Sequence, residues 1–197
     1  MKHGNKEYKM ESFDVYNPNG EKLSCSFLEP KDEADRSSMD MPCVIYMHGN
    51  ASCKMEGIEL AQDILPLGVN LCCFDFSGCG NSEGEWVTLG MKEDQDLKAV
   101  IEYLYENKRV SSIILWGRSM GAVTALHYVS DNEGTVNAVV LDSGFTSMKL
   151  VVDTLAGQMG VPPDFVQMLL PMLEMQIAQS TGIQGMLNMD VEPWAKK

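Results

Sequence analysis

Short apolar runs that alternate with helical stretches are the feature that most restricts how this chain can fold. Two runs, residues 43–47 and 69–74, have the composition of strands buried on both faces. Residues 112–116 and 136–141 are predicted to be two further strands. Between them lie stretches whose apolar side chains repeat every three or four positions, as in amphipathic helices. These are residues 55–65, 91–107 and 122–129. The alternation predicts an α/β fold, with a mostly parallel sheet flanked by helices on both faces.

An antiparallel hairpin is expected before this core. Residues 11–16 and 22–28 alternate apolar and polar side chains, and Asn-Pro-Asn-Gly at residues 17–20 supplies a turn between them. The two strands would lie at one edge of the sheet. The polar and charged residues 29–41 are typical of an exposed connection.

The pattern weakens toward the C-terminus. Residues 146–155 are expected to be helical, and the Met- and Leu-rich residues 161–177 to form a helix that Pro171 breaks. We interpret residues 1–197 as a single domain, within which residues 146–189 would form cap or lid helices.

The charge balance narrows the choice of partners. The chain has 15 Lys and Arg against 28 Asp and Glu, a net charge of −13. Nucleic-acid binding needs a basic surface, so this partner class is excluded.

No apolar run approaches the roughly 18 residues of a membrane span, and the first residues lack a signal peptide. We therefore expect a cytoplasmic protein, whose six cysteines, without C-x-x-C spacing, stay free thiols.

The sequence GRSMG at residues 117–121 carries the clearest chemistry. It is a G-x-S-x-G motif that directly follows a predicted strand and opens a predicted helix. In that setting a sharp turn presents the hydroxyl of Ser119 at the carboxyl edge of the sheet, where it can act as a nucleophile. Gly117 and Gly121 leave room for strand and helix to pass closely. The alternative is an ordinary Gly-rich turn.

A serine nucleophile also needs hydrogen-bond donors for the oxyanion of its tetrahedral intermediate. The backbone N–H of Met120 is the first expected donor. The second is expected from the sequence His48-Gly49-Asn50-Ala51 after the run 43–47, with the N–H of Asn50 as our assignment and that of Ala51 as the alternative. His48 and Gly49 would shape this loop, with His48 orienting it rather than acting in acid–base catalysis.

A third loop follows the run 69–74, with the pattern D-x-x-G-x-G-x-S at residues 75–82. A dinucleotide-binding G-x-G-x-x-G loop was the competing interpretation. It fails because Gly84 falls one residue late and no helix opens directly after it. The loop therefore gives no indication of a nucleotide cofactor.

The three loops together resemble the α/β-hydrolase superfamily. HGN after one strand, D-x-x-G-x-G-x-S after the next and G-x-S-x-G after a third look most like its serine aminopeptidase-like and depalmitoylase-like branch. The resemblance covers about residues 11–194. It implies esterase, thioesterase, lipase or peptidase chemistry on an acyl group, with no cofactor and no metal.

A general base for Ser119 is not evident. A serine hydroxyl needs an adjacent base, usually a histidine held by a carboxylate. Only His127 follows Ser119, and eight residues along one helix would place it roughly 12 Å away. His48 belongs to the oxyanion side, and His3 to an amino terminus expected to be mobile.

In the family that the chain resembles, a Pro-containing segment like residues 190–194 precedes the strand that carries the acid, and the histidine follows one strand later. The chain ends at Lys197, before either. Asp142, at the end of the run 136–141, is the alternative acid, one strand early. We therefore expect a hydrolase truncated before its acid- and His-bearing strands, with no general base and no activity on its own.

The sequence thus predicts a serine hydrolase that acts on a small-molecule or lipid acyl ester, thioester or amide through an acyl-enzyme on Ser119. The Met-rich residues 159–189 would suit an apolar acyl pocket, or would pack as ordinary helices. A non-catalytic binding protein with a hydrolase fold is one alternative. A fold completed by another chain is a second, in which an exposed sheet edge would favour self-association.

Overall fold

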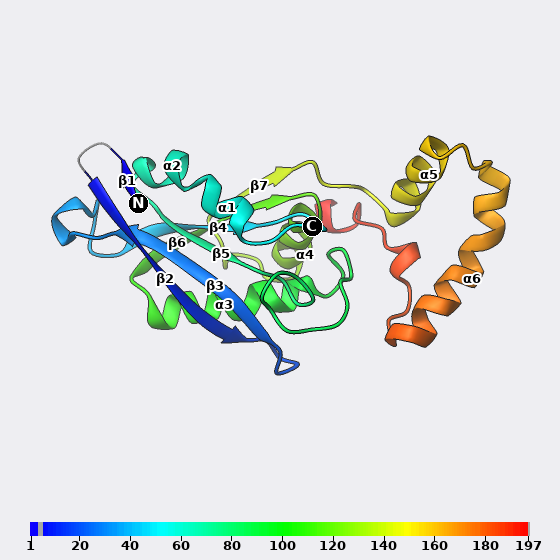
Figure 1. The fold of residues 1–197 in the computed structure, drawn as a ribbon, viewed down its shortest axis with the longest axis horizontal. Helices are drawn as coiled ribbons and strands as arrows, with labels where there is room; N and C mark the ends of the chain where they lie inside the picture. Colours follow the sequence, from blue (N-terminus) through cyan, green and yellow to red (C-terminus); the bar gives the residue numbers. More distant parts are fainter. Residues whose placement is uncertain (4–5, 197) are drawn as a thin grey trace. The chain divides into compact units, whose positions relative to one another are not determined.

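The apolar runs of the sequence lie side by side in one sheet (Figure 1). The computed structural model describes residues 1–3 and 6–196, and within them seven strands pair in the order β1-β2-β3-β5-β4-β6-β7. The strands are β1 (Lys2–His3), β2 (Lys6–Tyr16), β3 (Lys22–Pro30), β4 (Met41–Met47), β5 (Asn70–Phe74), β6 (Val110–Arg118) and β7 (Ala138–Asp142). Strands β4 to β7 are parallel to one another, and β1 to β3 pair antiparallel. The predicted α/β class, with an N-terminal antiparallel hairpin, is confirmed.

Helices cover both faces of this sheet. On one face, α3 (Glu93–Asn107) and α4 (Met120–Asp131) contribute to a core cluster that contains Cys43, Ile45 and Met47 of β4. On the other face, α2 (Ala61–Ile64) packs in a cluster with Val44 and Tyr46. Because successive side chains of a strand point to opposite faces, the continuous apolar run of β4 is buried from both sides.

The prediction of one helix over residues 55–65 is wrong. The segment forms α1 (Met55–Glu59), α2 and the 3₁₀ helix η2 (Leu65–Leu67). At Leu60 the backbone N–H bonds to the carbonyl of Gly57, three residues back, which tightens the turn and interrupts the α-helical pattern. The apolar repeat predicted the buried side of the segment, but not this change in its hydrogen bonds. A further 3₁₀ helix, η1 (Glu33–Asp35), lies in the connection between β3 and β4.

By its internal contacts the chain divides into two units, Met1–Gly144 and Phe145–Lys197. The second unit contains α5 (Met148–Gln158), α6 (Pro163–Thr181) and the 3₁₀ helices η3 (Met186–Asn188) and η4 (Trp194–Lys196). A bridge between Ser147 and Asp190 joins its two ends. The interpretation of the whole chain as one domain stays a prediction.

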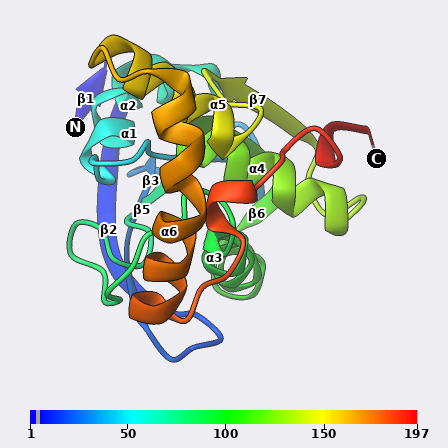
Figure 2. The same cartoon turned by 90° about the vertical axis from the view of Figure 1, so that its right-hand side faces the viewer.

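The predicted break at Pro171 is also wrong. Helix α6, the long orange helix of Figure 2, continues through this residue. Proline removes one backbone N–H and crowds the preceding turn, but in a long helix the hydrogen bonds on either side can keep the segment helical.

The strand order creates a switch point at the carboxyl end of β4. Strand β5 lies on one side of β4 and β6 on the other. The chain leaves β4 toward the face of α2, whereas it leaves β6 toward the opposite face, where α4 packs. Open α/β sheets bind their ligands in the crevice that opens at such a point. The predicted oxyanion loop follows β4, and the turn that carries the predicted nucleophile follows β6.

Candidate active site

Ser119 lies in a strained turn between β6 and α4. Its backbone has φ 51° and ψ −110°, a conformation that costs a non-glycine residue of order 1–3 kcal/mol. The turn is held because the Ser119 N–H donates to the carbonyl of Asp142 at 2.8 Å, and the Ser119 carbonyl accepts from Ala122 and Val123. The side chain is half-buried. This is the geometry of a nucleophile elbow.

The two glycines of the motif lie where no side chain fits. A Cβ on Gly117 would lie 2.1 Å from the carbonyl oxygen of Gly121, and a Cβ on Gly121 would lie 2.3 Å from that of Met47. Strand β6, the first turn of α4 and the end of β4 therefore approach one another closely. This close approach brings the start of α4 beside the loop that follows β4.

That loop, residues 48–52, is called the oxyanion loop below, after its predicted role. Asn50 is exposed, Gly49 is buried, and Ala51 has φ 57°, in the left-handed region. Among the residues that the structure describes, no acceptor takes a hydrogen bond from the N–H of Asn50, Ala51 or Met120. These donors are the ones that the sequence proposes for the oxyanion.

His48 is fully buried, and both of its ring nitrogens are engaged. Its Nδ1 lies 2.8 Å from the carbonyl of Gly49, and its Nε2 accepts a hydrogen bond from the N–H of Phe76 at 3.2 Å. Burial lowers the pKa of His48, so the ring is held neutral, with the proton assigned to Nδ1 by its acceptor. His48 thereby ties the oxyanion loop to the loop after β5, which suits the loop-orienting role predicted for it.

The loop after β5 is organised around the buried carboxylate of Asp75. Lys54 contacts it twice, through its N–H at 2.6 Å and its Nζ at 3.1 Å, and the N–H of Asn81 donates at 3.0 Å. Lys54 Nζ also donates to Ser24 Oγ at 2.6 Å. A Cβ on Gly80 would lie 2.3 Å from the Asp75 carboxyl carbon, which explains the glycine at this position. The D-x-x-G-x-G-x-S pattern is thus explained by loop structure.

Asp142, the alternative acid, lies at the end of β7 and pairs in register with Arg118. Its main-chain carbonyl holds Ser119, while its exposed carboxylate accepts a hydrogen bond from Ser143 Oγ at 2.7 Å. No described histidine is hydrogen-bonded to this carboxylate. The structure therefore brings Asp142 beside the elbow through its backbone.

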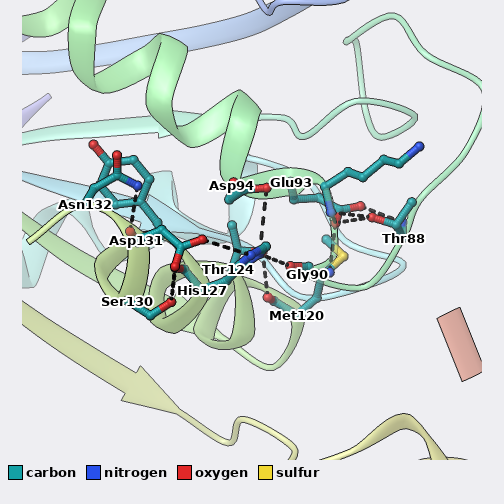
Figure 3. Close-up of polar contacts among 12 residues, drawn as sticks. Thr88, Gly90, Glu93, Asp94, Met120, Thr124, His127, Ser130, Asp131 and Asn132 are labelled. Carbon is teal, nitrogen blue, oxygen red and sulfur yellow. Dashed lines mark hydrogen bonds and ion pairs between the residues drawn. The ribbon is translucent and has the colours of Figure 1, made fainter. Parts of the chain in front are cut away.

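The remaining histidines are engaged elsewhere. His127 lies on α4, and its Nδ1 is 3.2 Å from the carbonyl of Gly90 (Figure 3). Its ring also lies between two carboxylates, 3.8 Å from Asp94 and 3.9 Å from Asp131. The backbone of His3, in β1, pairs with that of Lys6 in β2, in the terminus that was expected to be mobile.

One functional candidate escaped the sequence interpretation. Glu56, at the start of α1, binds Arg118 of the elbow. The sequence alone assigns no role to either residue. The available signal was a carboxylate shortly after the HGN sequence, but nothing in the chain's spacing pairs it with a residue 62 positions later.

Two further observations concern the described residues as a whole. None of their helices combines the length and the hydrophobicity that crossing a membrane requires. They also contain no cluster of three His, Cys, Asp or Glu side chains able to hold a metal ion.

Comparison with known proteins gives three results. A family described as "Serine aminopeptidase, S33" matches residues 41–189. Protein bem46 of Schizosaccharomyces pombe is 28% identical over 76% of this chain and 50% of its own length. Lysophosphatidylserine lipase ABHD12 of Danio rerio is 30% identical over 55% of this chain and 29% of its own length. The chain thus spans half or less of these relatives.

Among solved structures, the esterase Pf2001 of Pyrococcus furiosus has the same fold. It superimposes with a TM-score of 0.70 at 22% identity, over 96% of this chain and 66% of its own.

Proposed function

Because the chain belongs to the serine aminopeptidase (S33) family of α/β hydrolases, we propose that Ser119 is the nucleophile of an acyl-transfer reaction. The observation that carries the proposal is the strained conformation of Ser119 at the switch point of the sheet. A non-glycine residue persists at φ 51° only where its surroundings enforce it, and such strain clusters at active sites. The N–H groups of Asn50 and Met120, without acceptors in the described part of the chain, add support.

In the proposed reaction, Ser119 Oγ attacks the carbonyl carbon of an acyl ester or thioester. The carbonyl oxygen becomes an oxyanion, which accepts hydrogen bonds from the Asn50 and Met120 N–H groups. Collapse of this intermediate breaks the bond to the leaving alcohol or thiol, which takes up the proton from Ser119. Water then hydrolyses the acyl-enzyme and restores the serine.

The base that carries the proton is proposed to lie outside this chain. His48 uses both ring nitrogens within its loops, and His127 contacts Gly90. The role of Asp142 as an acid is proposed only as the alternative. The chain by itself would then acylate slowly.

Fluorophosphonate labelling with added imidazole tests nucleophile and base together. Mass spectrometry should find the label on Ser119 alone, and Ser119→Ala should abolish it. Imidazole at tens of millimolar should speed the labelling, because it would supply the base that is proposed to lie outside this chain. Fast labelling without imidazole would show that the chain contains its own base, and no labelling under either condition would overturn the proposed nucleophile.

The substrate is proposed to be a small-molecule or lipid acyl ester, thioester or amide. The name of one relative specifies a lysophosphatidylserine lipase and that of a structural neighbour an esterase, which favours esters. A series of p-nitrophenyl esters of increasing acyl length, assayed with imidazole, ranks the candidate acyl groups.

Residues 146–189 remain the proposed cap. Within the second unit they include the helices α5 and α6.

A second candidate, in which another chain completes the fold, is favoured by the edge strand β7. Among the described strands it pairs with β6 alone, and Val140 and Leu141 are 44% and 47% exposed. An exposed apolar edge favours pairing with another strand. Light scattering on the purified chain should then find self-association that Val140→Lys reduces, and a monomer at all concentrations would exclude it.

A further inference from the structure

Glu56, the second residue of α1, holds side chains from three separate segments of the first unit. Its Oε1 accepts a hydrogen bond of 2.6 Å from the hydroxyl of Tyr46, and its Oε2 accepts one of 2.5 Å from Ser52 Oγ. Arg118 donates to both oxygens, through Nη2 to Oε2 at 3.0 Å and through Nε to Oε1. One carboxylate thus joins the end of β4, the oxyanion loop and the elbow.

The helix that carries Glu56 is itself fixed by close packing. A Cβ on the next residue, Gly57, would lie 2.6 Å from Cδ1 of Tyr46 and 2.7 Å from Sγ of Cys73. Since only glycine fits there, α1 approaches β4 and β5 more closely than another residue would allow. This contact brings the Glu56 carboxylate to the end of β4.

Arg118 contacts the oxyanion loop a second time, through packing. A Cβ on Gly49 would lie 3.2 Å from Nη2 of Arg118, so the guanidinium lies against the backbone that leads into Asn50. On the other side of Asn50, Ala51 has φ 57° and is followed by Ser52, which Glu56 holds. The exposed Asn50 is therefore restrained from both directions.

The charges of this cluster persist across the working pH range. Burial alone would raise the pKa of Glu56, but hydrogen bonds from Arg118, Ser52 and Tyr46 outweigh it and lower this pKa to about 2. The hydrogen bond to Glu56 raises the pKa of Arg118. With the Arg118 side chain 44% exposed, such a pair contributes little to global stability. Its placement between two loops calls for a different explanation.

We propose that Glu56 is a positioning residue that, through Arg118 and Ser52, fixes the N–H groups of Asn50 and Met120 relative to each other for the oxyanion. The inference rests on the proposed function. Preorganised donors are effective only when held at the place where the charge develops. The carboxylate of Glu56 accepts its hydrogen bonds from Tyr46, Ser52 and Arg118, and so acts through the two loops.

Glu56→Gln is the main test, because it removes the charge and leaves an amide facing three donors. The matched control is Glu33→Gln, which breaks a second bidentate pair, that of Arg109 and Glu33, with contacts of 3.0 and 3.2 Å. Fluorophosphonate labelling of Ser119 with imidazole should slow at least about tenfold in Glu56→Gln and stay unchanged in Glu33→Gln. Arg118→Lys keeps the charge without the two-pronged geometry, so its loss should be intermediate.

The concentration dependence of labelling separates positioning from a loss of binding or of fold. The maximal labelling rate should fall in Glu56→Gln while the half-saturating reagent concentration stays constant. Equal rates in Glu56→Gln and Glu33→Gln would overturn the inference, as would a change in the half-saturating concentration alone.

Amide hydrogen exchange distinguishes failure of this inference from failure of the proposed function. If Ser119 of the unmodified chain is never labelled, the proposed function fails. The hydrogen-exchange rates of peptides covering residues 48–54 then test whether Glu56 holds the oxyanion loop in place. Faster exchange in Glu56→Gln, with no change in Glu33→Gln, supports Glu56 as the residue that holds the loop; equal exchange overturns it.

Discussion

The loops after β4 and β5 follow neighbouring buried strands, yet they satisfy their polar groups in opposite ways. The loop after β5 turns inward: Asp75 is 1% exposed and takes hydrogen bonds from Lys54 and Asn81. The oxyanion loop turns outward, with Asn50 exposed and its N–H without an acceptor among the described residues. The buried hydrogen bonds of the loop after β5 stabilise the folded chain. The oxyanion loop leaves donors for a ligand and requires bracing from outside, which Glu56 and Arg118 supply.

Asp75→Ala should produce the largest loss of stability. It would leave the ammonium group of Lys54 buried beside Ser24 without its charge partner, and breaking a buried pair in this way costs about 3–5 kcal/mol. Urea denaturation followed by circular dichroism measures the change against Glu33→Gln, whose exposed pair should matter by less than about 1 kcal/mol. Similar midpoints for the two variants would contradict the assignment of Asp75 as the organiser of its loop.

A matched pair of glycine substitutions sharpens the comparison. At Gly80, with φ 54°, an added Cβ would meet the Asp75 carboxylate, so Gly80→Ala should cost about 2–4 kcal/mol. At Gly49 the nearest atom is the end of the Arg118 side chain, which can move. Gly49→Ala should therefore cost less than about 1 kcal/mol while slowing Ser119 labelling. Urea midpoints and labelling rates of both variants check this, and the reverse order of stabilities would contradict it.

The sequence predicted those parts of the molecule in which local pattern and packing agree. The runs that became β4, β5 and β6 are apolar because both faces of the sheet are covered there, and the elbow is recognisable because Gly117 and Gly121 fit close backbone contacts. The division at Leu60 and the continuity at Pro171 were missed, since single hydrogen bonds decide them within a correct apolar repeat.

Glu56 shows the limit of such prediction for the site. Its role depends on the strand order, which places α1 beside the elbow although the two are far apart in the sequence. Residue spacing carries no trace of that proximity. By contrast, the local HGN pattern indicated the position of His48, whose two contacts suit a loop-orienting residue.

Replacing the nucleophile should relieve strain. Glycine adopts φ 51° without the penalty that Ser119 carries, so Ser119→Gly should raise the free energy of unfolding by about 1 kcal/mol while abolishing labelling. Ser119→Ala is the control, because it also removes the hydroxyl but keeps the strain. Urea denaturation should therefore order the variants with Ser119→Gly above Ser119→Ala. Equal stabilities would mean that the elbow stores no strain.

The smallest effect concerns the link that His48 makes between the two loops. Burial lowers the pKa of His48 below its usual value of 6.5, so the unfolded chain takes up this proton more readily than the folded chain. The contribution of His48 to stability is therefore present above pH 6.5 and is lost as the pH falls through this value toward the lower folded pKa.

Lowering the pH from 7.5 to 5.5 should accordingly reduce the urea midpoint, and His48→Asn should flatten that dependence. The buried Asp96, whose pKa is raised by burial, acts in the opposite direction, because protonation at low pH relieves its buried charge. His127→Asn, on α4 beside Asp94 and Asp131, serves as the comparison. If His127→Asn flattens the dependence and His48→Asn does not, proton uptake at the link between the two loops does not control it.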